Sequence, residues 1–350
     1  RNIAELNEGA ISHDLDFKVY FARKANKGLT FVAAAVDAGA GIDVASEIEL
    51  LQCLEQGIAA NEIFCTAAVK NESLIQHCVH QGIPLTIDNH DELEMVLQAA
   101  AACQRRALVA IRLSGFEHAG SILHSRFGVS VEKSHEFCTQ TDPQLLDIVG
   151  IHFHLNGYSA AERVSGILQS LEIVHGIRRL GHSVSFLDIG GGIPISYLAD
   201  EAQWREFWLQ HSRALLGHRS AITYRTHGLG LRVVDGKIVG QRNCYPFFQS
   251  LTRADWLDTI LGSPDTSANG GSVADALRRT EIQLRCEPGR SILDGCGITV
   301  ARVEFCKIDT RGEFLVGLSM NRTQCRTSSD DFLVDPILIP KPSRPAGEEM

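Results

Sequence analysis

The sequence lacks the features that mark several large classes of protein. It has no run of the roughly 20 apolar residues that a membrane-spanning helix needs, and the longest candidate, residues 31–40, is short and rich in alanine. It has no C-x-x-C pair, and its ten cysteines are scattered through 350 residues, which favours reduced thiols over a disulfide scaffold. No block of Lys and Arg stands out, and the formal net charge of −9 opposes binding to nucleic acid. We therefore expect a cytoplasmic protein with neither a membrane nor a nucleic acid as partner.

What the sequence does contain is ordinary globular composition with a regular alternation of patterns. Hydrophobic residues make up 44% and charged residues 21%, which excludes disordered and low-complexity classes. Short β-rich runs alternate with amphipathic helical patterns, and the strands are predicted at residues 18–21, 41–44, 62–65, 84–88, 107–113, 149–154, 184–188 and 282–287. Helices are predicted between them, for example at 46–56, 71–81, 90–103 and 160–180, and three glycines stop such patterns: Gly57, Gly82 and Gly181. Eight strands separated by helices fit a (β/α)8 TIM barrel, although an open doubly wound sheet would alternate in the same way.

The alternation breaks in two places. Residues 220–279 are irregular and rich in glycine, and they are predicted to be an insertion between the last two barrel strands. After Glu287 the pattern turns strand-rich without long helices, at 298–308, 314–318 and 332–339. We therefore predict an α/β barrel domain over 1–290 with an insertion at about 220–279, the start of a β-rich second domain over 291–340, and a mobile tail over 341–350.

Lys24 closes the first predicted strand, after the apolar residues Tyr20 and Phe21. In a TIM barrel the carboxyl ends of the strands face the active site. A lysine in partly apolar surroundings can have its pKa lowered enough to form a Schiff base with an aldehyde. A solvated lysine at a strand end would give the same sequence pattern.

Two turns at predicted strand ends carry residues suited to a phosphate. The first, D-I-G-G-G-I-P, begins at Asp188, and its glycines let backbone N–H groups approach a phosphate closely. It is not G-x-G-x-x-G, so the dinucleotide fingerprint is not satisfied. The second, C-E-P-G-R, begins at Cys286 and offers both a carboxylate and a phosphate-binding cation. Each pattern is also compatible with an ordinary surface turn.

Two histidines occupy alternate positions of one predicted strand. His152 and His154 should therefore point to the same face of that strand. Such a pair could ligate a metal, but no carboxylate or group of cysteines near them in the sequence completes a set of zinc ligands. We therefore predict no metal site.

Six motifs follow one another in a fixed order along the chain. They are Y-x-A-x-K-A-N at 20–26, D-x-x-S-x-x-E at 43–49, S-R-F-G at 125–128, H-x-H at 152–154, D-x-G-G-G-x-P at 188–194 and E-P-G-R at 287–290. Together they resemble the fold-type III pyridoxal-phosphate (PLP) decarboxylases, the group of diaminopimelate, ornithine and arginine decarboxylases. The resemblance covers residues from about 15 to 340. It is closest in pattern to the diaminopimelate enzymes, although divergent, through Met320-Asn321 and the later Arg326.

The resemblance implies a role for each of these residues. Lys24 would hold PLP as a Schiff base, His154 would stack on its ring and Glu287 would pair with the pyridine nitrogen, whereas His152 would only pack. Asp43 would lie near Lys24, although Asp43 and Ser46 are both also typical helix N-caps. The remaining residues expected to bind the cofactor are Ser159, Gly190, Gly191, Gly192, Gly289 and Arg290.

The resemblance also implies a reaction. It is the PLP-dependent decarboxylation of an amino acid, diaminopimelate-like or otherwise basic or dibasic, by a homodimer, with Arg326 as a candidate for the distal carboxylate. Glu287 favours decarboxylation, because the related alanine racemases place an arginine against the pyridine nitrogen. The alternatives are a PLP-dependent racemase and a PLP-binding but catalytically silent homologue with a regulatory role.

The sequence departs from the family pattern in two respects. Two extra residues separate His154 from Ser159, compared with the usual H-x-G-S. The late segment whose cysteine serves the family as general acid is not found, because Cys325 lies too early to match it. We therefore expect the chain to be incomplete.

Overall fold

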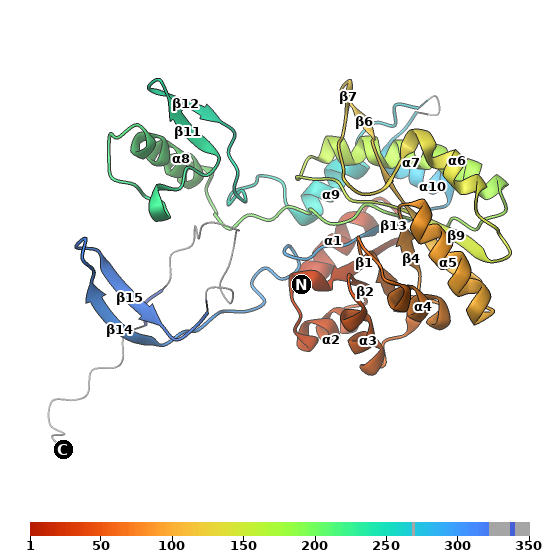
Figure 1. Ribbon diagram of the computed structural model, residues 1–350. Coiled ribbons are helices and arrows are strands. Elements are labelled where there is room, and N and C mark those ends of the chain that lie inside the picture. The colour runs from red at the N-terminus through yellow and green to blue at the C-terminus, as the bar shows by residue number, and fades with distance from the viewer. Residues whose placement is uncertain (268–269, 322–336, 340–350) are drawn as a thin grey trace, which may run out of the picture. The chain divides into compact units, whose positions relative to one another are not determined.

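The computed structural model describes residues 1–267, 270–321 and 337–339, and within them the chain forms two compact units (Figure 1). The first unit comprises Arg1–Ser196 and Gln249–Cys296, and the second comprises Tyr197–Phe248 and the part of the chain from Gly297 onward. Arg326, residues 332–336 of the strand predicted at 332–339, and the predicted tail lie outside the described residues, whereas 337–339 are described and form no strand.

Eight parallel strands of the first unit close into a barrel. In the order of their pairing they are β1 (Phe17–Ala22), β2 (Gly41–Val44), β3 (Ile63–Cys65), β4 (Leu85–Ile87), β5 (Ala107–Ser114), β9 (Leu146–Phe153), β10 (Phe186–Asp188) and β13 (Gln283–Cys286). The pairing of β13 with β1 and that of β4 with β5 close the ring. A short strand, β8 (Val129–Ser130), extends β5, and a small hairpin joins β6 (Glu117–His118) to β7 (Ser121–Ile122). The predicted TIM barrel is confirmed.

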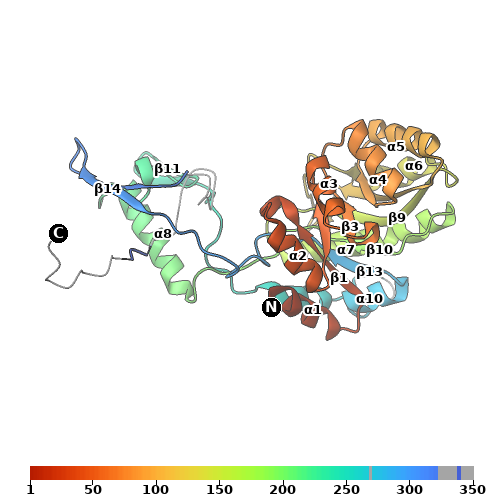
Figure 2. The ribbon, with the colours of Figure 1, turned by 90° about the horizontal axis from the view of Figure 1, so that it is seen from below.

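Helices surround the strands on the outside of this unit (Figures 1 and 2). They are α1 (Asn2–Ile11), α2 (Leu29–Asp37), α3 (Glu47–Glu55), α4 (Glu72–Gln81), α5 (His90–Cys103), α6 (Ser134–Thr139), α7 (Ala160–Arg179), α9 (Arg253–Leu261) and α10 (Val273–Thr280). Side chains at the N-caps fix where several of them begin, because the side chains of Ser46, Asn71 and Asn89 each accept a backbone N–H of the first turn. Gly57, Gly82 and Gly181 have positive φ at or after the ends of three helices, as predicted.

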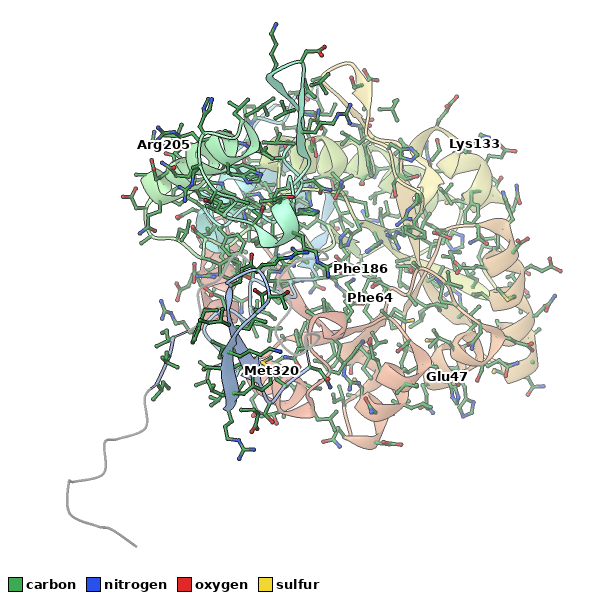
Figure 3. The ribbon with its side chains drawn as sticks, turned by 60° about the vertical axis from the view of Figure 1, so that its left-hand side comes forward. Glu47, Phe64, Lys133, Phe186, Arg205 and Met320 are labelled. Carbon is green, nitrogen blue, oxygen red and sulfur yellow. The ribbon has the colours of Figure 1, made fainter. Side chains whose placement is uncertain are left out.

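Aromatic rings fill part of the inside of the barrel. Tyr20, Phe64 and Phe186 form a small buried cluster, with the centroids of Phe64 and Phe186 5.5 Å apart and nearly perpendicular (Figure 3). Glycines on neighbouring strands leave the space that these rings occupy. A Cβ at Gly150 would lie 2.3 Å from the Phe186 ring, and one at Gly41 would lie 2.4 Å from the Tyr20 ring.

The described residues of the second unit form one long helix and two hairpins. The helix is α8 (Glu201–Leu215), and the hairpins pair β11 (Leu231–Val234) with β12 (Lys237–Gly240) and β14 (Val303–Ile308) with β15 (Phe314–Leu318). Trp208 and Phe247 are buried, and Trp204 stacks on Phe247 with centroids 5.8 Å apart. The strands of β14 and β15 agree with the predicted start of a β-rich region.

The segment that groups outside the barrel, 197–248, overlaps only partly with the predicted insertion at 220–279. Helices α9 and α10 group with the barrel because their apolar faces are buried there, for example at Trp256 and Leu277. The chain leaves and re-enters the barrel unit at neighbouring points, since Gln249 N–H donates to Ser196 Oγ at 3.3 Å. Among the described residues, no helix combines the length and apolar character that crossing a bilayer requires.

Candidate active site

The side chains singled out in the sequence come together at the carboxyl ends of the barrel strands. Lys24 lies in a short 3-10 helix, η1 (Arg23–Ala25), directly after β1, and Asp43 is the third residue of β2. His152 is near the end of β9, and Glu287 follows β13. Parallel strands of a barrel end at one face, which is why residues so far apart in the sequence meet there.

Lys24 points its amine between two buried carboxylates. Its Nζ lies 3.5 Å from Asp43 Oδ2 and 3.9 Å from Glu287 Oε2, and 46% of the Lys24 side chain is exposed. Burial acts to lower the pKa of Lys24, but the charges of Asp43 and Glu287 outweigh it, so the pKa is raised. The expectation that apolar surroundings lower this pKa is therefore wrong, because the sequence did not reveal that two carboxylates face the amine.

Asp43 is fully buried and takes part in the site. Burial, and then the charge of Glu287, raise its pKa to about 6. Its Oδ1 accepts a short hydrogen bond from Thr66 Oγ1, while its Oδ2 has no hydrogen-bond partner among the described residues. The cap of α3 is Ser46, whose Oγ accepts the N–H of Glu49. Of the two residues that could have been N-caps, only Ser46 is one.

Glu287 is a fully buried carboxylate at the centre of this cluster. Among the described residues neither of its oxygens accepts a hydrogen bond, although His152 Nε2 lies 3.1 Å from Oε1. The His152 nitrogens also lack hydrogen-bond partners, and burial holds the pKa of this imidazole well below its usual value. A buried carboxylate that accepts no hydrogen bond is costly, and both oxygens of Glu287 can still accept an N–H group.

His154 is held by the glycine turn on β10. Its Nδ1 accepts the N–H of Gly191 at 3.3 Å, and burial lowers its pKa to about 4, so the ring is neutral at pH 7. One ligand atom each of His152, His154 and Glu287 lies within 4.8 Å of the others, a spacing that a metal ion could use. The sequence argument that no carboxylate accompanies the two histidines is therefore wrong, because β13 brings Glu287 beside β9.

The turn after β10 packs against backbone on both sides. A Cβ at Gly190 would lie 2.6 Å from the carbonyl oxygen of Phe153, and one at Gly191 would lie 2.9 Å from that of Glu287. Gly190 and Gly192 also have positive φ, at +70° and +80°. The N–H of Glu287 donates to the carbonyl of Gly190 at 3.0 Å, which ties this turn to the end of β13. Only glycines allow this close approach.

The other predicted phosphate ligands lie around this turn or beyond it. Gly289 is required beside Lys24, since a Cβ there would lie 2.7 Å from the Cβ of Ala25, and Arg290 is exposed. The hydroxyl of Ser159 accepts the N–H of Glu162 at 3.2 Å and caps α7. A hydroxyl that accepts can also donate, so the role of Ser159 at a phosphate stays a prediction.

Two arginines in this region were missed by sequence reasoning. Arg112, on β5, is largely buried beside the Phe127 ring, and burial lowers its pKa although the charge of Glu287 opposes this. The sequence could have indicated Arg112, because an arginine within an otherwise apolar barrel strand is unusual. Arg163, on α7, is completely buried, and its partners are backbone carbonyls that leave no mark in the sequence.

These side chains fit PLP. The unpartnered oxygens of Glu287 suit a protonated pyridine nitrogen, and the neutral ring of His154 offers a flat face for stacking. The accessible amine of Lys24 suits the aldehyde, and the tight turn at Gly190–Gly192 suits a phosphate.

Comparison with known proteins identifies the family. The model for the pyridoxal-binding domain of pyridoxal-dependent decarboxylases matches residues 5–221. The chain is 30% identical over 343 residues to the uncharacterised protein y4yA of Sinorhizobium fredii, covering 97% of this chain and 69% of the relative. It is 27% identical over 320 residues to a diaminopimelate decarboxylase of Aquifex aeolicus, covering 86% of this chain and 60% of that enzyme. It is also 24% identical over 178 residues, half of this chain and 38% of the relative, to antizyme inhibitor 2 of the mouse.

Solved structures agree on the fold. The diaminopimelate decarboxylase of Helicobacter pylori, crystallised with L-lysine, has a TM-score of 0.61 at 18% identity, covering 91% of this chain and 68% of that one. SrLDC, crystallised in complex with PLP and cadaverine, has a TM-score of 0.59 at 19% identity, covering 91% of this chain and 65% of that one. The chain thus spans between 60% and 69% of the length of the S. fredii, A. aeolicus, H. pylori and SrLDC proteins. With its pyridoxal-binding domain matched over residues 5–221, it belongs to the family of pyridoxal-dependent decarboxylases.

Proposed function

We propose that this protein is a PLP-dependent amino-acid decarboxylase that carries its cofactor on Lys24. The observation that carries the proposal is the position of Glu287, a buried carboxylate that accepts no hydrogen bond from the described residues and lies 3.9 Å from the lysine amine. An acid facing the pyridine nitrogen keeps that nitrogen protonated, which favours decarboxylation over the racemase alternative.

Each residue of the site has a distinct task in this proposal. When bound, PLP supplies the electron sink into which the electrons of the Cα–CO2 bond pass. Lys24 must lose a proton before its amine can react, and the unpartnered Oδ2 of Asp43, 3.5 Å away, is the nearest atom that can take it. His154 orients the ring by stacking. Gly190–Gly192, Gly289 and Arg290 hold the phosphate, with Ser159 as a further donor.

The substrate is proposed to be diaminopimelate or another basic or dibasic amino acid. Support comes from the named relatives, which include diaminopimelate decarboxylases, and from a structural neighbour that was crystallised with L-lysine. Arg326, proposed to receive a distal carboxylate, lies outside the described residues. We further propose a cytoplasmic homodimer.

A catalytically silent regulator is the second candidate. The similarity to antizyme inhibitor 2 over half of the chain favours it. The two candidates differ in a measurable way, because a silent homologue would release no CO2 from any amino acid even when PLP is bound.

The test begins with an absorption spectrum of the purified protein with added PLP, before and after treatment with borohydride. We expect a new band in the wild type, and peptide mapping should find the reduced cofactor on Lys24. Lys27→Ala is a matched control, because Lys27 lies three residues away and pairs with Glu49 outside the cluster. Lys24→Ala should lose the label, and Lys27→Ala should keep it.

Release of CO2 from a panel of diaminopimelate, lysine, ornithine and arginine then decides the reaction. Turnover of one of them supports the decarboxylase. PLP on Lys24 with no turnover of any amino acid supports the silent homologue. Absence of label, or label that survives Lys24→Ala, refutes both.

A further inference from the structure

Arg163 joins the loop after β9 to the glycine turn after β10. Its side chain is completely buried, and its Nη2 donates to the carbonyls of Leu155 at 3.1 Å, Gly157 at 2.9 Å and Gly191 at 3.4 Å. The guanidinium also packs against the turn, because a Cβ at Gly192 would lie 2.6 Å from Nη2. One side chain thus fixes two segments that end at the active site.

Arg163 forms no ion pair in the described part of the chain, although the charge of Glu162 acts on it. Its Nε and Nη1 are buried without a hydrogen-bond partner among the described residues. Its other neighbour is the ring of Trp256, 5.9 Å away, whose Nε1 donates to the carbonyl of Tyr158. Burial lowers the pKa of Arg163 to about 10, so it remains a cation at neutral pH. A buried cation without an anion is stabilised by any anion that binds nearby.

The hydrogen bond to Gly191 determines where the next N–H points. The peptide bonds of the described residues are all trans, and across a trans peptide the carbonyl and the following N–H point in opposite directions. Holding the Gly191 carbonyl toward Arg163 therefore turns the Gly192 N–H away from it. In this turn the N–H of Gly190 is taken by Asp188 and that of Gly191 by His154, whereas the N–H of Gly192 has no partner among the described residues.

We propose that Arg163 is a positioning residue for the phosphate end of the cofactor site. It orients the Gly192 N–H toward the phosphate through the Gly191 peptide, and it adds the buried positive charge that makes this end selective for a dianion. The inference rests on the proposed function, because it assumes that PLP is the ligand.

The experiment compares PLP with pyridoxal, which has the same ring and aldehyde but no phosphate. Dissociation constants for both are measured by absorption titration of the full chain, in the wild type and in Arg163→Met. We expect Arg163→Met to reduce the preference for PLP over pyridoxal on the order of 10- to 100-fold, the range for losing a charge-assisted contact. Affinity for pyridoxal should change little.

Arg178→Met is the matched control. Arg178 lies at the other end of α7 and likewise donates to three backbone carbonyls, those of Val184, Thr280 and Glu281. Its loss should lower the melting temperature and leave the preference for PLP as in the wild type.

A second variant covers the case in which Arg163→Met does not fold. Arg163→Gln keeps a donor but removes the charge, and its preference for PLP should also fall. If either folded variant keeps the wild-type preference, or loses affinity for PLP and pyridoxal in equal proportion, Arg163 is only structural and the inference is overturned. Failure of the wild type to bind either compound would instead refute the proposed function.

Discussion

Glu287→Gln should lower the pH at which Lys24 becomes reactive. The Lys24 amine has two carboxylates within 4 Å, and their charges are what raise its pKa against the opposite effect of burial. Glutamine keeps the shape of Glu287 and removes its charge. The amine then keeps only Asp43 as a counterion.

The size of the effect follows from the distance. At 3.9 Å and an effective dielectric constant of about 20, one pair of charges interacts by roughly 4 kcal/mol. Because 46% of the Lys24 side chain is exposed, solvent screens this interaction, and about 1–2 kcal/mol is a fairer value. The pKa of Lys24 should therefore fall by about one.

The assay is the rate at which added PLP forms its absorption band, measured from pH 8 to pH 12, because the pKa of Lys24 is raised above the ordinary lysine value of 10.5. Asp43, with a pKa of about 6, is ionised over this range and contributes a constant charge. The midpoint of the rate profile should move down by about one pH unit in Glu287→Gln. Glu62→Gln makes the same change of charge beside Lys18, at 2.6 Å, and should leave the midpoint in place. An unchanged or higher midpoint in Glu287→Gln would refute the electrostatic reasoning.

Three further changes test the packing and electrostatics around the site. Asp43→Asn should raise the free energy of unfolding by about 2 kcal/mol at pH 8 and leave it unchanged at pH 3. The pKa of this acid is raised from its ordinary value of 3.8 to about 6 in the fold, so the wild type loses stability as the pH rises between these values. Gly150→Ala should lower the free energy of unfolding by about 1–3 kcal/mol, because the added methyl group overlaps the Phe186 ring. Ser159→Ala should cost about 1 kcal/mol by removing the cap of α7. Denaturant titration measures all three.

Each of these changes has an outcome that contradicts it. Gly176→Ala is the control for Gly150→Ala: its Cβ would meet only a ring nitrogen of His135, at 3.9 Å, so alanine should stabilise α7 by about 0.5–1 kcal/mol. Equal effects of the two alanines would mean that the barrel interior is not tightly packed. A wild-type stability of Asp43→Asn at pH 8 would show that the buried carboxylate carries no cost. A loss of PLP affinity in Ser159→Ala without a loss of stability would place this hydroxyl at the phosphate instead of the cap.

The strands and helices of the barrel were predictable because their signals are local. Helix α5 lies at 90–103 and strand β2 at 41–44, as periodicity and flanking residues predicted. The limits of the inserted segment were not, because α9 and α10 are short and amphipathic, and their place on the barrel depends on partners elsewhere in the chain. Because residues 220–279 are rich in glycine, the sequence did not predict these two helices.

The part of the site that could be predicted is the part that follows from the meeting of parallel strand ends at one face of the barrel. That rule brings Lys24, His154 and Glu287 together without any distances. It gives neither the sign of the shift in the pKa of Lys24, which depends on two carboxylates at 3.5 and 3.9 Å, nor the task of Arg163. Arg163 donates to main-chain carbonyls, which every residue type has. No pattern of residue types in the sequence therefore predicts its partners.

The hydrogen bond between Gln249 and Ser196 has a consequence for how this barrel can change over generations. The chain departs after β10 and returns at almost the same point, so the 52 residues between, Tyr197–Phe248, form a long loop whose two ends lie close together. The entropy of closing a loop grows only slowly with its length, by about 0.6 kcal/mol for each doubling. Such a junction tolerates growth of the loop that it closes while the barrel strands stay in place. It is therefore a position at which evolution or design can lengthen the chain at little cost to the barrel.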